Sequence, residues 1–518
     1  MYQVCRERDG YNRNRTRKLA DEKGNGNMFL TSLLKNIDYK CIAGNINIEI
    51  TDLIYDSRKV TEGSVFFCID GVVTDGHSYA AQAVEKGAKA LIVEHEVELN
   101  DADAGDDVTI IKVESTRYAM ALMSAEYFNN PSEEAVIIGI TGTKGKTSTA
   151  FMIKDMIEKA GHRCGIIGTI GAFWGDTKIK TGLTTPESYV LQSLFRQMVD
   201  DGCEYIVMEV SSQALKMDRT AGVEFDYAVF TNFSPDHIAD GEHATLDEYR
   251  ECKEKLFSQC KTGIFNLDDE VSDTFIRHAG CDTIVTFGTT DDADVYADNV
   301  ERWSKDGKLG IRYDMKGMFE GRVALEIPGV FNAYNSLAAI TICRLIGIDM
   351  EILTEVIEKV RIHGRVELVN VSDEFSVIVD YAHNEVSTRS VLETLKEYNP
   401  NRIICVYGGG GNRSKLRRYD MGEVTGELAD LSILTCDNPR DEEIKDINND
   451  IKIGLAKHDG KYVEIEDRTD AIEYALRNAE RGDVIILLGK GHEDYQEIKG
   501  VKYHYSEREA IMEAAARL

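Results

Sequence analysis

The 518-residue sequence has few prolines and no long apolar run, and each absence excludes a class of protein. It contains only 6 prolines beside 43 glycines, a balance that suits an α/β enzyme and not a disordered or fibrous chain. No apolar run reaches the about 18–20 residues that a membrane span requires. The charged N-terminal segment is not followed by the apolar stretch of a signal peptide. We therefore expect a cytoplasmic protein without membrane insertion.

Excess positive charge and paired cysteines are also lacking. The sequence has 60 Lys and Arg residues against 90 Asp and Glu, a formal net charge of −30 that would repel a nucleic-acid backbone. We expect no nucleic-acid partner. An anionic substrate is still compatible with this charge if local cations and metal ions reverse the field at its site. The 11 cysteines include no CxxC pair, so we expect buried, reduced thiols instead of disulfides or structural zinc.

The length and the order of apolar segments predict three domains. Residues 1–27 are polar and basic, and we expect a disordered leader; a helical pattern begins at Met28. Short apolar strands and an Ala-rich helix then predict a first α/β domain over residues 28–130. Alternating strands and helices over 131–361 predict a central domain with a parallel sheet, and a third α/β unit spans 362–518. The expected fold class is therefore α/β, in three domains.

A glycine-rich loop between a predicted strand and a predicted helix is the strongest single motif. It reads Gly139-Ile-Thr-Gly-Thr-Lys-Gly-Lys-Thr147. Backbone N–H groups of such a loop and the helix N-terminus bind phosphates, while Lys146 would reach the terminal phosphates and Thr147 would offer a hydroxyl to Mg²⁺. Five residues, not the usual four, separate Gly139 from Gly145, and the alternative is a glycine turn with a surface lysine. The candidate nucleotide-binding residues are Gly142, Thr143, Lys144, Gly145, Lys146, Thr147 and Ser148.

Two further polar residues follow predicted strands of the central domain. Glu209 ends the strand 206–210, and His237 follows the strand 227–233. A carboxylate and a neutral imidazole at neighbouring strand ends can hold metal ions beside bound phosphates. Taken alone, His237 would be interpreted as a structural or surface histidine. Together with the loop, the two residues predict a metal centre.

A series of longer motifs resembles the Mur ligase family, specifically the members that add the third residue of the peptidoglycan stem peptide. The motifs are GTKGKT, TTPES, MEVSSQAL, FTNFSPDH, ECKEKLF, PGVFNAYNSLAA, HGRVE, VDYAH, GGGGNR, DNPR and GKGHEDYQ, and they cover nearly the whole chain from about residue 28. The resemblance implies a uridine-nucleotide-binding first domain, a central P-loop ATPase domain and a Rossmann-like C-terminal domain that binds the amino acid. It implies a monomeric, ATP- and Mg²⁺-dependent ligase that joins a free amino acid to UDP-N-acetylmuramoyl-L-alanyl-D-glutamate through an acyl phosphate.

The resemblance also assigns roles to individual residues. Lys253 in ECKEKLF matches a carbamylated lysine that ligates a second Mg²⁺, whereas without the resemblance it would be interpreted as a solvated helix lysine. The implied catalytic residues are Lys146, His237 and Lys253, and the implied metal ligands are Thr147, Glu209, His237 and Lys253. Further nucleotide contacts are Asn332, Asn335, Arg365 and Asp380. The positions that match contacts of the UDP-muramoyl peptide are Ser57, Thr184, Thr185, Ser211 and Arg219.

The sequence also bears on which amino acid is added. The loop that contains Asn438 and Arg440 follows a predicted strand, and an Arg fork suits a carboxylate. With an amide and an acid nearby, this favours meso-diaminopimelate, whose distal end bears both carboxylate and ammonium. L-Lysine is the alternative, as the segment 232–257 resembles lysine-adding relatives, and Arg440 could instead cap its loop or pair with Asp441. The candidate residues are Arg413, Asp437, Asn438, Arg440, Gly489 and Glu493.

Three other functions are weaker alternatives: a folylpolyglutamate synthetase, the Mur enzyme that adds a dipeptide, and a non-ligase P-loop protein. The Tyr55-Asp56-Ser57-Arg58 segment, which resembles the family's uridine-binding segment, and the DNPR block disfavour the first two. A non-ligase protein would release no phosphate in response to an amino acid.

Overall fold

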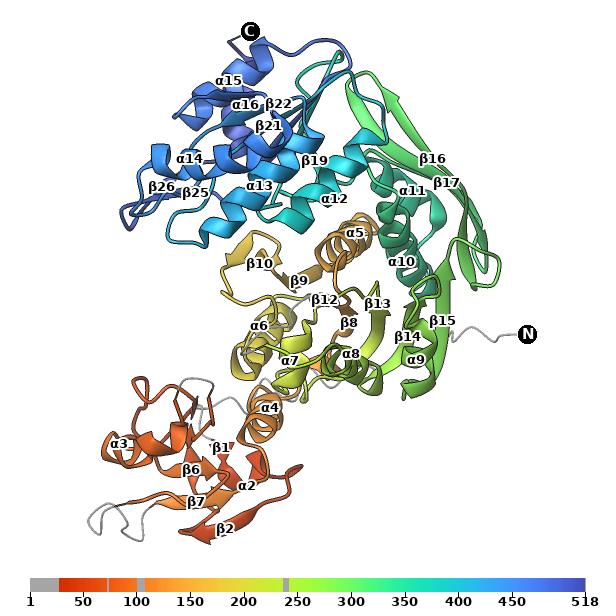
Figure 1. The fold of residues 1–518 in the computed structure, drawn as a ribbon. Coiled ribbons are helices and arrows are strands. Elements are labelled where there is room, and N and C mark those ends of the chain that lie inside the picture. Colours follow the sequence, from red (N-terminus) through yellow and green to blue (C-terminus); the bar gives the residue numbers. More distant parts are fainter. Residues whose placement is uncertain (1–27, 72–73, 100–107, 236–241, 518) are drawn as a thin grey trace.

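Three lobes follow one another in chain order, each built on its own sheet (Figure 1). The structure, a computed structural model, describes residues 28–71, 74–99, 108–235 and 242–517. Strands and helices alternate in each lobe, which confirms the expected three-part α/β class. The predicted domain limits stay a prediction, and the predicted leader, residues 1–27, lies outside the described residues.

The first lobe contains a five-stranded sheet that is parallel except for its β2 edge. The helical pattern expected from Met28 begins later, because Met28 and Phe29 pair antiparallel with Glu49 and Ile50 as strands β1 and β3. In sheet order the strands are β2 (Lys40–Ala43), β7 (Thr109–Lys112), β6 (Ala90–Val93), β5 (Val65–Phe67) and β4 (Leu53–Ile54); the helices are α2 (Leu30–Leu33), α3 (Ala80–Glu85) and α4 (Thr116–Tyr127).

The central lobe has an 11-stranded sheet whose seven middle strands are parallel, as expected. Hairpins at both edges add antiparallel strands, and the long β16–β17 hairpin was not predicted. In sheet order the strands are β11 (Thr177–Ile179), β10 (Gly171–Trp174), β9 (Cys164–Gly168), β12 (Tyr205–Glu209), β8 (Val136–Thr141), β13 (Phe225–Phe230), β14 (Cys260–Asn266), β15 (Thr283–Gly288), β16 (Val295–Lys305), β17 (Lys308–Gly317) and β18 (Gly321–Leu325).

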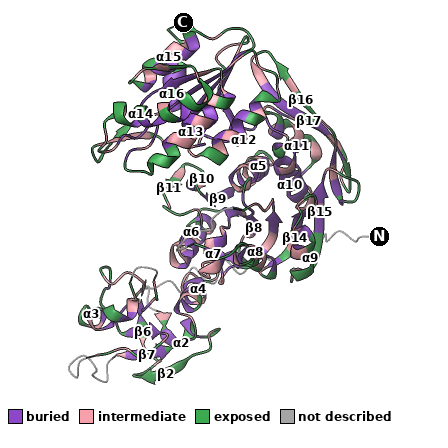
Figure 2. Ribbon diagram, in the orientation of Figure 1, coloured by how far each residue is buried: buried purple, intermediate pink, exposed green. Residues whose placement is uncertain are grey.

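Helices of the central lobe cover both faces of this sheet (Figure 1). Most of the parallel strands are apolar and buried, as expected for strands covered on both sides (Figure 2). The helices are α5 (Lys146–Lys159), α6 (Ser188–Asp200), α7 (Ser212–Lys216), α8 (Leu246–Glu254), α9 (Ser272–His278), α10 (Phe331–Leu345) and α11 (Met350–Lys359).

The third lobe has a six-stranded sheet that is parallel except for its β19 edge. In sheet order the strands are β19 (Glu367–Leu368), β20 (Ser376–Asp380), β24 (Val484–Leu488), β21 (Ile403–Tyr407), β22 (Leu431–Leu434) and β23 (Tyr462–Glu464). A separate hairpin joins β25 (Tyr495–Ile498) to β26 (Val501–His504), and the helices are α12 (Glu385–Lys396), α13 (Lys415–Leu428), α14 (Ile444–Leu455), α15 (Arg468–Arg477) and α16 (Glu507–Ala515).

The sequence predicts no disulfide and no membrane span, and both predictions can be compared with the residues that the structure describes. The ten cysteines within it form no disulfide, and most of them are buried. None of its helices is long and apolar enough to cross a membrane.

Candidate active site

The glycine-rich loop joins β8 to α5 near the middle of the central sheet, and two of its glycines are required by geometry. Gly142 has φ +144°, and a Cβ atom there would lie 2.0 Å from Thr231 Oγ1. Gly145 has φ +87° and precedes α5, and its Cβ would lie 2.3 Å from Asn335 Oδ1. Only glycine adopts these backbone angles readily and fits these spaces. The second contact also places Asn335, from the distant helix α10, directly against the loop.

Two lysines meet at one carbonyl of this loop. Lys146 Nζ donates to the carbonyl oxygens of Gly142 at 2.8 Å and Thr143 at 3.0 Å. Lys253 of α8 donates to the same Gly142 oxygen at 2.9 Å, and its Nζ lies 4.5 Å from the centre of the Tyr249 ring. The Lys253 side chain is buried, which excludes the alternative of a solvated helix lysine. Positive charge is thus concentrated at this loop in a protein of net charge −30.

Glu209, at the end of β12, is buried and accepts hydrogen bonds at both carboxylate oxygens. Its Oε2 accepts from Thr147 Oγ1 at 2.9 Å and from Thr169 Oγ1 at 3.1 Å, and its Oε1 accepts from the Thr169 backbone N–H at 2.9 Å. A Cβ on Gly168, the last residue of β9, would lie 2.2 Å from Oε1, so only glycine leaves room for this carboxylate. A carboxylate and a hydroxyl are hard oxygen ligands of the kind that Mg²⁺ prefers, so this pair fits the implied metal.

The residues that match the muramoyl-peptide contacts lie around the same strand end. Thr185 Oγ1 donates to the backbone oxygen of Glu209 at 2.8 Å and accepts from the backbone N–H of Ser211 at 3.0 Å. Arg219 donates to the backbone oxygen of Thr185 at 3.2 Å, and Thr184 Oγ1 lies 3.1 Å from Thr169 Oγ1. The structure therefore brings these positions together beside Glu209.

Ser57 lines a cavity of about 680 Å³ between the first lobe and the central lobe. Tyr55 and Arg58 line it too, together with Arg117 of the first lobe and Glu187 of the central lobe, which form an ion pair at 3.5 Å. Burial raises the pKa of the Tyr55 hydroxyl. The volume suits a nucleoside-sized ligand.

The four further nucleotide positions divide between two lobes. Asn332 and Asn335 lie on α10, where Asn335 Nδ2 donates to Asn332 Oδ1 at 3.0 Å. Asp380 ends β20 and accepts from the backbone N–H groups of Val366 and Ala382, each at 2.8 Å. Burial raises the Asp380 pKa. Its carboxylate thus holds the backbone at Val366 and Ala382. The neighbouring Arg365 guanidinium lies 5.2 Å from the centre of the Tyr381 ring.

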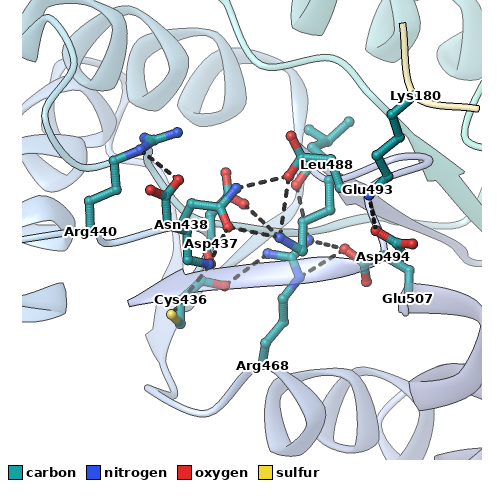
Figure 3. A network of polar contacts seen from close by, with 12 residues as sticks. Lys180, Cys436, Asp437, Asn438, Arg440, Arg468, Leu488, Glu493, Asp494 and Glu507 are labelled. Carbon is teal, nitrogen blue, oxygen red and sulfur yellow. Dashed lines mark hydrogen bonds and ion pairs between the residues drawn. The ribbon is translucent and has the colours of Figure 1, made fainter. Parts of the chain in front are cut away.

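All six residues predicted for the amino acid line one cavity of about 120 Å³ at the strand ends of the third sheet. Arg440, labelled in Figure 3, donates to Glu497 Oε2 at 3.1 Å and to the backbone oxygen of Gly411 at 2.7 Å. It therefore pairs with Glu497 and not with Asp441, whose carboxylate accepts from Asn412. The cavity wall also contains residues that the sequence analysis did not single out, among them His383, Ser414 and Arg417.

One predicted site residue, His237, lies outside the described residues. A histidine pair that was not predicted lies in the first lobe, where Asp75 accepts from His77 Nδ1 at 2.6 Å and lies 3.2 Å from His95 Nε2. His77 Nε2 accepts from the backbone N–H of Glu94 at 2.9 Å, so the proton of the neutral ring is on Nδ1. Nδ1 carries the proton and the Nε2 lone pair is engaged by the Glu94 N–H, so His77 offers no free lone pair to a metal, and the cluster ties the turn to β6.

Taken together, a phosphate-binding loop, a carboxylate–hydroxyl pair and binding cavities on two other lobes define a multi-domain P-loop enzyme with several substrates. Sequence profiles identify the family of this enzyme. The Mur ligase family catalytic domain matches residues 49–128, the Mur ligase middle domain matches 140–343, and the Mur ligase glutamate ligase domain matches 364–491. The chain belongs to the Mur ligase family, and is thus an ATP-dependent ligase that forms a carbon–nitrogen bond.

Individual relatives agree with this assignment. The UDP-N-acetylmuramoyl-L-alanyl-D-glutamate–2,6-diaminopimelate ligase of Clostridium perfringens is 42% identical over 490 residues, 93% of this chain and 99% of that protein. The protein of the same name from Geobacillus thermodenitrificans is 38% identical over 95% of this chain and 99% of its own length. A solved structure of a ligase of this name has a TM-score of 0.70 at 27% identity and covers 95% of this chain and 99% of its own. Mycobacterium tuberculosis folylpolyglutamate synthase, at 16% identity, a TM-score of 0.56 and coverage of 78% of this chain and 94% of its own, shares the fold.

Proposed function

We propose that this protein adds meso-2,6-diaminopimelate to UDP-N-acetylmuramoyl-L-alanyl-D-glutamate in cytoplasmic peptidoglycan precursor synthesis, acting as a monomer. The observation that carries the proposal is the cavity of the third lobe, where an arginine fork, an amide and a carboxylate line one small space. Relatives about 40% identical over most of the chain bear this activity in their names, which supports it.

In the proposed reaction, ATP transfers its γ-phosphoryl group to the side-chain carboxylate of the D-glutamate residue, giving an acyl phosphate. The amine of diaminopimelate then attacks the acyl carbon, phosphate leaves, and an amide bond forms. Lys146 binds the terminal phosphates and stabilises the charge of the tetrahedral intermediate together with His237. Thr147, Glu209, His237 and carbamylated Lys253 would hold Mg²⁺, which when bound neutralises phosphate charge.

The proposed specificity depends on Arg440. Its Nε and one terminal amine bind Glu497 and Gly411, and within the described part of the chain its Nη2 amine makes no hydrogen bond. That amine is the donor proposed for the distal carboxylate of diaminopimelate. The Glu493 carboxylate, beside Asn438, would accept the distal ammonium. L-Lysine has no distal carboxylate, so it would leave this donor without a partner.

The proposed carbamylation of Lys253 is supported by its place beside the loop. The side chain is buried and its Nζ is 2.9 Å from the Gly142 oxygen, so an added carboxylate would lie near the phosphate-binding residues. We expect Lys253→Ala to be nearly inactive and partly restored by a short added carboxylate. Full activity of this variant, or a mass spectrum and crystal structure showing an unmodified amine remote from any metal, would contradict the assignment.

Phosphate release tests the proposed function directly. The enzyme is incubated with ATP, Mg²⁺ and UDP-N-acetylmuramoyl-L-alanyl-D-glutamate, and candidate amino acids are added one at a time. We expect release that depends on both the nucleotide-linked dipeptide and diaminopimelate, with the tripeptide product confirmed by mass. Release without an amino acid, or greater efficiency with L-lysine, would refute the proposal.

A further inference from the structure

Lys490 is a buried lysine directly behind the amino-acid cavity, and no step of the proposed reaction involves it. It follows Gly489 at the end of β24, and its relative exposure is 0%. Its Nζ atom lies 3.3 Å from Asn438 Oδ1, 3.5 Å from Asp437 Oδ1 and 3.5 Å from Glu493 Oε2. A buried cation is costly unless polar partners surround it. All three partners are residues of the cavity wall.

Aromatic rings enclose the other sides of this lysine. Its Nζ lies 5.7 Å from the centre of the Tyr495 ring and 5.9 Å from that of Tyr505, within the range of cation–π attraction. These rings and the wall residues leave the ammonium group no exposure to solvent. Its interactions are therefore with the protein, and any substrate in the cavity would meet the wall residues instead.

A second buried cation fixes the strand ends that carry these residues (Figure 3). Arg468 pairs with Glu507, its Nε donating to Oε1 at 2.8 Å. It also donates to the backbone oxygens of Cys436 at 3.2 Å and Leu488 at 3.0 Å. These bonds fix the backbone where the loops after Cys436 and Leu488 begin. They do not fix the side chains of those loops.

Lys490 is one of three groups that fix the orientation of the Asn438 amide. Asn438 Oδ1 accepts from Lys490 Nζ and from the backbone N–H of Glu497 at 2.9 Å. Its Nδ2 donates to Glu493 Oε2 at 2.8 Å (Figure 3). A flipped amide would turn its N–H groups toward the ammonium and its oxygen toward the carboxylate, which is unfavourable at both ends. The cation also offsets the mutual repulsion of Asp437 and Glu493.

We propose that Lys490 is a positioning residue for the amino-acid substrate: it holds the Asn438 amide in one orientation and pairs with Asp437 and Glu493, so that the cavity wall is preset for the polar end of the incoming amino acid. This inference rests on the proposed function and extends it to a residue that does not touch substrate. Without the cation, two carboxylates would lie in the wall without their counter-charge, and only the Glu497 N–H and Glu493 would orient the Asn438 amide.

The test is the variant Lys490→Met, whose unbranched side chain is one heavy atom shorter than that of lysine and carries no charge. We expect the KM for diaminopimelate to rise about tenfold or more, because buried polar groups lose their partner, while kcat and the KM values for ATP and the nucleotide-linked dipeptide change by less than about twofold. The preference for diaminopimelate over L-lysine should fall as well. Lys490→Arg, which restores charge, should recover part of the affinity.

Lys452→Met is the matched control in the same lobe. Lys452 also pairs with a carboxylate, Glu464 at 2.8 Å, and lies 5.8 Å from the Tyr462 ring, but it lines no part of the cavity. We expect its kinetics to equal those of the wild type. An unchanged KM for diaminopimelate in folded Lys490→Met, or an equal loss for all three substrates, would overturn the inference.

A second variant and a parallel assay of the wild type complete the test. If Lys490→Met does not fold, Lys490→Gln is measured instead. Because it keeps a donor for Asn438 Oδ1 but loses the charge, the KM for diaminopimelate should rise by less than in Lys490→Met, and an unchanged KM would refute the inference. The wild type is assayed in parallel: if it rejects diaminopimelate, the proposed function fails. The Lys490 inference is then judged by the KM for the amino acid that the wild type does accept.

Discussion

The substitution Gly411→Ala should separate the two loops that form the amino-acid cavity. The Gly411 N–H donates to the backbone oxygen of Asn438 at 2.8 Å, and a Cβ on Gly411 would lie 1.8 Å from the backbone oxygen of Pro439. Ordinary contact begins at 3.4 Å, so the loops must move apart by 1.6 Å. The loop that moves carries both Asn438 and Arg440.

The magnitude follows from that displacement. Overpacking a tight contact costs about 1–3 kcal/mol of stability. A misplacement of about 1 Å in a binding group can cost on the order of 100-fold in rate. We therefore expect kcat/KM for diaminopimelate to fall by roughly 10- to 100-fold, with the KM values for ATP and the nucleotide-linked dipeptide nearly unchanged because those sites lie elsewhere.

Gly410→Ala is the neighbouring control. Its Cβ would meet only Arg413 Cγ and Arg440 Nη1, both at 3.4 Å and both on flexible side chains. Steady-state kinetics with diaminopimelate varied, together with thermal unfolding, should separate the two variants. If Gly411→Ala behaves as Gly410→Ala does, the argument from loop contact is wrong.

Three further outcomes are expected. Lys146→Ala and Glu209→Ala should each lower turnover to less than about a tenth of the wild-type value with the fold intact, since a lost phosphate or metal contact costs several kcal/mol of barrier; phosphate release together with circular dichroism checks this, and higher turnover in either variant contradicts it. Arg440→Ala should reduce the preference for diaminopimelate when it competes with L-lysine at equal concentration, and an unchanged ratio of products would reject the role given to Arg440. Burial lowers the pKa of His492 to about 4, so relative to an unfolded value of about 6.5 its contribution to stability is complete above pH 6.5 and is lost as the pH falls toward 4. Unfolding midpoints of His492→Gln should accordingly decline less over that window than those of the wild type, and parallel declines would exclude this contribution.

Much of the site could be predicted because parallel strands place their carboxyl ends at one edge of a sheet. Glu209 and Thr147 lie about 60 residues apart in sequence and yet meet at 2.9 Å, since β12 and β8 are neighbours. In the third lobe, the loops after β21, β22 and β24 converge on one cavity for the same reason.

Other features could not be predicted because they depend on tertiary contacts between distant segments. Lys490 stands between two glycines, where a lysine is ordinarily exposed, and only the fold places it behind the cavity. The contact of Asn335 with Gly145 requires α10 to pack beside the loop. Arg440 was expected to bind a substrate carboxylate or Asp441, and its pairing with Glu497 depends on the β25–β26 hairpin.

The net charge of −30 does not prevent the anionic substrates of the proposed reaction from binding, because distant surface charge is screened and charge at the site is not. At physiological ionic strength, surface charges are screened beyond about 8 Å, so most of the acidic surface contributes little at the site. Lys146 Nζ, in contrast, lies 2.8 Å from a carbonyl oxygen of the phosphate-binding loop, where its field acts nearly unscreened, and Mg²⁺ held by Glu209 and carbamylated Lys253 would add positive charge there. The field that an incoming phosphate meets is therefore set by the loop and its few neighbours. A sequence-wide charge count predicts the partners that are excluded, and only the local arrangement predicts the substrate that is accepted.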